Sequence, residues 1–124
     1  MSSFLTDRKR ATGLGSGRHG THHFWQMIVS SLLMGLAVPA FVITFALSFG
    51  RSQEEVLAFY GQPIPALILA LSIFIIIRHA MWETLEAVED YVHGTLGKLL
   101  QIAVTAFSYT LIAMGIFALA RIAL

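Results

Sequence analysis

The sequence contains no cysteine, and this absence removes several kinds of chemistry. Disulfide bonds, iron–sulfur ligation and thiol catalysis all require cysteine side chains. Any metal centre held by this chain would therefore depend on histidine, methionine or carboxylate ligands.

Charge is also scarce, because only 12% of the 124 residues are Asp, Glu, Lys or Arg. Soluble domains carry about 25% charged residues. With 56% hydrophobic residues and a mean hydropathy of +0.75, the chain is suited to lipid as its solvent. The net charge of +1 argues against a nucleic-acid partner. So short a chain is expected to need partner chains to enclose a large cofactor.

Three apolar segments predict an all-α integral membrane protein with three transmembrane helices, at about residues 24–49, 64–86 and 99–121. We expect residues 1–23 to be an N-terminal segment and residues 24–124 to be the membrane domain. The first segment has no charged residue, and Pro39 is expected to kink it. The second must run on to about Leu85 to cross a core of about 30 Å, which places His79 inside the membrane.

Different residues mark the two connections between the predicted spans. Ser52 followed by Glu55 fits a capping box, which predicts a short interfacial helix ending at Gly61. Pro63 and Pro65 suit the first turn of the second span. Gly94 and Gly97 are interpreted as the second break, with 86–98 as a cytoplasmic connection.

The basic residues predict the orientation. Four of them precede the first span, whereas the first connection offers only Arg51. The positive-inside rule then places the N-terminus in the cytoplasm and, after three spans, the C-terminus in the periplasm. The N-terminal segment lacks the features of a cleavable signal.

A polar stripe runs along the second span. At 100° per residue, one side of the helix carries Ser72, His79, Glu83, Glu86 and Asp90. Such a stripe should face protein, cofactor or water, because ionisable groups in contact with lipid are costly. Glu83 and Glu86 have two interpretations, a solvated helix end or a functional role. His79 is either an axial metal ligand or a satisfied core histidine.

Other motifs are weaker. Haem with two histidine ligands would need its second ligand from another chain, because His79 is the one deep histidine. The literal G-x-G-x-x-G at 15–20 lacks the strand and soluble helix of a nucleotide site, so we interpret it as a loop. Tyr91 fits an aromatic belt residue or a phenol that is hydrogen-bonded to substrate. Basic residues near the start of the first span could meet haem propionates.

The motifs together resemble a known family. His79 followed by Asp90 and Tyr91, with GRHGTHHF at 17–24 opening the first helix, resembles the hydrophobic membrane anchor of bacterial succinate dehydrogenase. The most specific part is EDYVH at 89–93, and TDRKRATGLGS at 6–16 is similar to alphaproteobacterial versions. The resemblance covers nearly the whole chain.

The resemblance implies one anchor of a four-chain succinate:ubiquinone oxidoreductase in the bacterial inner membrane. Its implied partners are a flavoprotein with FAD, an iron–sulfur protein, and a second membrane anchor of the cytochrome b type. It implies a haem b between the two anchors, with His79 as one axial ligand. It also implies that Tyr91 contacts ubiquinone, with Asp90 beside it to assist proton supply or hold the pocket. Succinate chemistry would lie on the partner chains.

One departure concerns the haem propionates. Many relatives carry an arginine shortly after the Trp of the first helix, where this chain has Gln26-Met27-Ile28. Arg18, His22 or Arg78 could take its place. Two other functions stay open: a haem-free anchor or assembly protein that docks a soluble partner, and a transporter component that uses the polar stripe.

Overall fold

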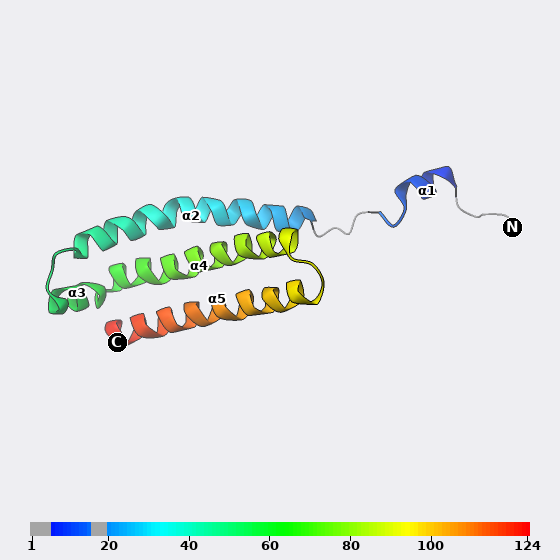
Figure 1. Ribbon diagram of the computed structural model, residues 1–124. Coiled ribbons are helices and arrows are strands. Elements are labelled where there is room, and N and C mark those ends of the chain that lie inside the picture. The colour runs from blue at the N-terminus through cyan, green and yellow to red at the C-terminus, as the bar shows by residue number, and fades with distance from the viewer. Residues whose placement is uncertain (1–5, 16–19) are drawn as a thin grey trace.

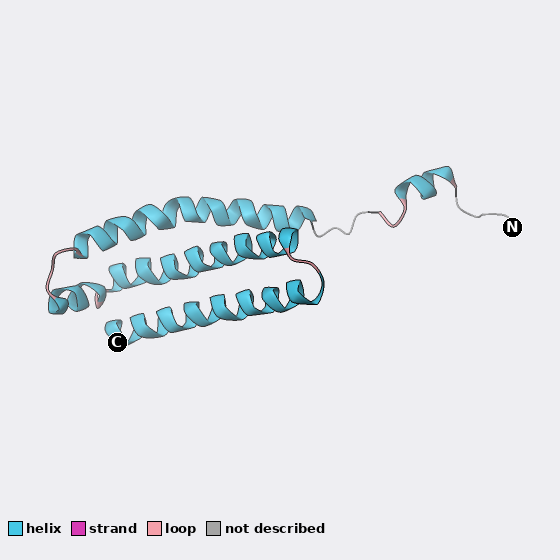
Figure 2. Cartoon of the chain, viewed as in Figure 1, coloured by secondary structure: helices cyan, strands magenta, loops and turns pink. Residues whose placement is uncertain are grey.

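The computed structural model describes residues 6–15 and 20–124, and within these ranges the chain is helical with no strand (Figure 1, Figure 2). The helices are α1 (Asp7–Thr12), α2 (Gly20–Ser48), α3 (Gln53–Tyr60), α4 (Pro63–Tyr91) and α5 (Gly94–Ala123). By length and composition, α2, α4 and α5 can each cross a membrane. The predicted all-α class with three candidate transmembrane helices is therefore confirmed.

Helix α4 lies between the other two long helices. It packs against α2 on one side and against α5 on the other, and the described residues of α2 and α5 do not contact each other (Figure 1). The three helices thus form an open row instead of a closed bundle. Large apolar side chains such as Leu36 and Phe107 remain exposed on the outside of this row, at 74% and 65%.

Small residues allow α4 to approach both neighbours. Ser72 of α4 is 2% exposed and lies against Ala37 of α2. Its hydroxyl donates to the Ile68 carbonyl at 2.7 Å and to the Ala37 carbonyl at 3.5 Å. Gly115 of α5 meets the side chain of Ile73, where an added Cβ would come within 3.1 Å. Interfaces of this kind depend on backbone approach and van der Waals contact, because burial against lipid-like side chains gives little driving force.

The capping box predicted for the first connection is present. The Ser52 hydroxyl accepts from the Glu55 backbone N–H at 3.3 Å, and the Glu55 carboxylate accepts from the Ser52 N–H at 2.9 Å. Helix α3 ends before Gly61, and Pro63 and Pro65 lie in the first turn of α4. Tyr60 is buried, with its phenol 3.3 Å from the Ser48 hydroxyl at the end of α2. This contact fixes α3 across the end of the row.

The second connection between the long helices is a two-residue turn. Helix α4 continues through Tyr91 and α5 begins at Gly94, so Val92 and His93 join them. Gly94 has a φ of 75°, which a glycine adopts without strain. Gly97 lies inside α5, where an added Cβ would collide with the Val92 carbonyl. Gly97 is therefore not a helix breaker; it makes room for the tight return of the chain.

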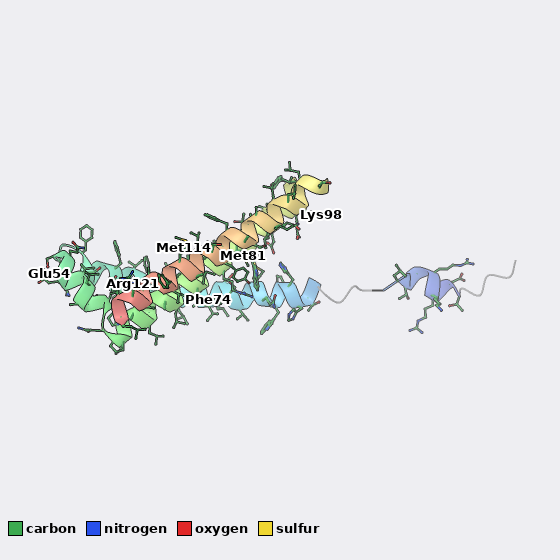
Figure 3. All side chains as sticks on the ribbon, turned by 90° about the horizontal axis from the view of Figure 1, so that it is seen from below. Glu54, Phe74, Met81, Lys98, Met114 and Arg121 are labelled. Carbon is green, nitrogen blue, oxygen red and sulfur yellow. The ribbon has the colours of Figure 1, made fainter. Side chains whose placement is uncertain are left out.

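Charged residues mark the two ends of the row. Glu54 and Arg121 lie at one end, and Lys98 lies at the opposite end (Figure 3). The beginning of α2 shares the Lys98 end with the last turns of α4, because successive long helices are antiparallel (Figure 1). His79 lies between these ends.

Candidate functional site at the α2–α4 interface

His79 lies well inside α4. It follows Pro63 by 16 residues and precedes Tyr91 by 12, so it is about 24 Å from one end of the helix and about 18 Å from the other. Its side chain is 17% exposed. Its Nδ1 lies 2.8 Å from the hydroxyl of Ser30 on α2. The sequence could not reveal this contact, because the two residues are 49 positions apart.

The second ring nitrogen has a longer contact. His79 Nε2 lies 3.6 Å from Glu83 Oε1, one turn further along α4, and the Glu83 side chain is 55% exposed. This separation exceeds a normal hydrogen bond. The Ser30 hydroxyl on a neighbouring helix therefore engages one ring nitrogen, while the other ring nitrogen faces Glu83 at a longer distance.

The polar stripe predicted on α4 faces α2 at three levels. Ser72 contacts Ala37, His79 contacts Ser30, and Glu86 Oε1 lies 3.5 Å from His23 Nδ1. Glu86 thus links α4 to the first turn of α2, a role that sequence reasoning left undecided. Its partner ring also lies 6.1 Å from the indole of Trp82, measured between centroids.

A groove of about 290 Å³ opens beside Ser30, between α2 and α4. Its walls are mostly apolar, with two indoles and one cation among the lining residues Trp25, Gln26, Ser30, Phe74, Arg78 and Trp82. The Arg78 guanidinium stacks on Trp82 at 4.7 Å from the ring centroid and donates to the Tyr109 hydroxyl at 3.3 Å. Arg78 pairs with no carboxylate of residues 6–15 and 20–124.

Asp90 and Tyr91 are the last two residues of α4 and are both exposed, Tyr91 at 84%. They lie at the same end as His22, whose Nε2 is 3.0 Å from the Gln26 side-chain amide. The structure therefore separates His79 from Asp90 and Tyr91 along α4 instead of bringing them into one pocket. Arg18 lies outside the described residues.

The donor set is suited to a single axial bond. In the described part of the chain, no three His, Asp or Glu residues group closely enough to hold a metal ion. Metal-ligating histidines usually donate their other ring N–H to a neighbouring acceptor, and the contact between His79 Nδ1 and Ser30 is compatible with that arrangement. A macrocycle that already supplies four nitrogens fits this donor set better than a bare ion does.

These features define an integral membrane anchor with three helices and a polar site along its central helix. The chain belongs to the family described as succinate dehydrogenase/fumarate reductase transmembrane subunit, whose model matches residues 5–120. It is also similar to the succinate dehydrogenase hydrophobic membrane anchor subunit of Paracoccus denitrificans. The two are 40% identical over 121 residues, which cover 98% of this chain and 94% of that protein. No solved structure gives a significant match.

Membership of this family, together with the three apolar helices, identifies the chain as a multi-pass protein of the bacterial inner membrane that serves as a membrane anchor. The resemblance seen in the sequence is thereby confirmed.

Proposed function

We propose that the chain is the anchor of a succinate:ubiquinone oxidoreductase in which it shares a haem b and a ubiquinone site with partner chains. The observation that carries the proposal is the placement of His79, a single imidazole inside α4 with Nδ1 bonded to Ser30 and with Nε2 near Glu83 but beyond hydrogen-bond distance. His79 would give the haem one ligand, and a second histidine ligand would have to come from the other anchor chain. The open row of helices, with α4 uncovered on two sides, leaves room for that partner.

When bound, haem b supplies a one-electron carrier inside the membrane. This chain would hold the haem through His79 and would place positive charge near the haem propionates. Arg78 supports this role, because its charge faces a groove and has no carboxylate partner among the described residues. An intramembrane cation of this kind is usually paired with an anion. Arg78 and His22 are therefore the candidate propionate contacts in the described part, and Arg18 is a candidate from outside it.

The quinone site is assigned to the end of α4. The exposed phenol of Tyr91 would donate a hydrogen bond to a quinone carbonyl and favour the negative charge that grows as the ring is reduced. Asp90 lies beside it and can pass protons from the aqueous edge. About 18 Å along α4 separates this position from His79, so the two groups serve two sites.

The orientation follows from the basic residues. The end of the row that holds Asp90 and Tyr91 also holds the start of α2, which follows Arg8, Lys9 and Arg10 in the chain. The positive-inside rule makes this the cytoplasmic end. The soluble iron–sulfur protein and the flavoprotein would dock there, and the C-terminus would be periplasmic.

The decisive experiment is His79→Ala in the purified native complex. Loss of the b-type absorbance, with the four chains still co-purifying, is the expected result because the axial bond is gone. Thr84→Ala is the matched control, since Thr84 is exposed on the same helix and its hydroxyl bonds the Ala80 carbonyl, away from the imidazole. An unchanged b-type spectrum in His79→Ala would show that this chain gives haem no ligand.

A further inference from the structure

We propose that Ser30 is the positioning residue for His79, fixing the plane and tautomer of the imidazole so that Nε2 is presented for ligation. The inference rests on the proposed function, because it takes His79 as a haem ligand. It adds a residue of α2 to the ligand environment.

The geometry at Nδ1 supports this role. The Ser30 hydroxyl lies 2.8 Å from Nδ1, a normal hydrogen-bond distance, in a partly buried position between the two helices. Side-chain hydrogen bonds link the described residues of α2 and α4 at two places: this contact and the bond from Ser72 to Ala37. The Ser30 bond thus holds the ring from a second helix, in addition to the longer contact with Glu83 on α4.

Hydrogen-bond chemistry decides the tautomer. A hydroxyl can donate or accept, so Ser30 can bond either neutral form of the imidazole. When Nε2 gives its lone pair to a metal, the proton must lie on Nδ1, and Nδ1–H then donates to the Ser30 oxygen. Metal-ligating histidines usually donate their other N–H in this way, and the donation makes the ligand more basic.

The contact between His79 Nε2 and Glu83 favours the other neutral tautomer of the imidazole. Glu83 lies 3.6 Å from Nε2, and a proton on that nitrogen would be drawn toward the carboxylate. With the proton on Nε2, the lone pair on Nδ1 would point at the Ser30 hydroxyl and no ligand would be presented. The Ser30 hydroxyl lies 2.8 Å from Nδ1, where its oxygen can accept a hydrogen bond from Nδ1–H. This bond favours the tautomer that leaves the Nε2 lone pair for the metal.

The test compares Ser30→Ala, Ser30→Thr and Ser30→Val in the intact complex. Threonine and valine have nearly the same shape and differ in the hydroxyl, so the pair separates the hydrogen bond from packing. Ser31→Ala is the control, because Ser31 is exposed on the same turn and has no side-chain hydrogen bond to the described residues. The readouts are haem retained per complex, the electron paramagnetic resonance spectrum of the ferric haem, and the midpoint potential.

Loss of a partner that orients a ligand weakens metal binding by about ten- to a hundred-fold. We therefore expect Ser30→Ala and Ser30→Val to release haem about ten- to a hundred-fold more readily and to change its resonance spectrum and potential. Ser30→Thr should restore all three, and Ser31→Ala should leave them unchanged. If Ser30→Ala lowers assembly, the Ser30→Thr and Ser30→Val variants are compared by haem content per assembled complex. This comparison still tests whether the hydroxyl positions His79.

Two failures can be told apart. If Ser30→Val matches Ser30→Thr in haem retention, spectrum and potential, Ser30 has no positioning role, although His79 can remain the ligand. If His79→Ala keeps the b-type spectrum, the ligand assignment itself is wrong and the role of Ser30 falls with it.

Discussion

Glu86 Oε1 lies 3.5 Å from His23 Nδ1, and this pair joins the last turns of α4 to the first turn of α2. Both side chains are about half exposed, at 44% and 51%. The pair lies at the end of the row that also carries Asp90 and Tyr91, so it keeps the proposed quinone site close to the start of α2.

Glu86→Gln should change the stability of the complex by less than about 1 kcal/mol, because exposed pairs are screened and add little. Thermal unfolding of the detergent-solubilised complex at low and high salt measures the change. A larger loss that vanishes at high salt would show that the pair is a main link between the helices.

Tyr91→Phe should lower ubiquinone reduction while leaving succinate oxidation by an artificial acceptor intact. A hydrogen bond to a charged group contributes about 1.5–3 kcal/mol, which corresponds to a rate loss of roughly ten- to a hundred-fold. Steady-state assays with the two acceptors give the comparison, and the artificial acceptor serves as the internal control. Wild-type activity with both acceptors in Tyr91→Phe would show that Tyr91 is an aromatic-belt residue.

Gly97→Ala should impair assembly, because the new Cβ meets the Val92 carbonyl, a backbone atom that cannot rotate away. Overpacking of this kind costs about 1–3 kcal/mol. The yield and melting temperature of the membrane-extracted complex report the effect, and Thr95→Ala, at an exposed position two residues earlier, is the control. Wild-type yield and melting temperature for Gly97→Ala would contradict the tight turn.

Glu55 should titrate below the usual carboxyl range. The backbone N–H of Ser52 is the largest cause of its lowered pKa, followed by the Ser52 hydroxyl, and nearby Arg51 also lowers it. The folded pKa is below the unfolded one, so the cap stabilises α3 above the normal carboxyl pKa and is lost as pH falls through the folded pKa. Carbon NMR of the labelled carboxyl measures this pKa. In Ser52→Ala it should move back toward its usual value; no difference between the two proteins would contradict the hydroxyl's part in the cap.

Several features of this protein were determined by local sequence. The apolar lengths predicted three membrane helices, since a lipid core demands about 20 such residues whatever the neighbours are. The Ser52–Glu55 capping box was equally predictable, because its partners are three residues apart. The resemblance carried by His79, Asp90 and Tyr91 identified the family without any knowledge of packing.

Only the tertiary structure decided what surrounds those residues. Periodicity placed Ser72, His79 and Glu86 on one side of α4, but not which helix that side meets; the contacts with Ala37, Ser30 and His23 show that it is α2. The break expected around Gly94 and Gly97 became a two-residue turn, because a glycine that seems to end a helix can instead make room for one. Contacts between residues far apart in the chain depend on helix register and approach, and no local pattern encodes these.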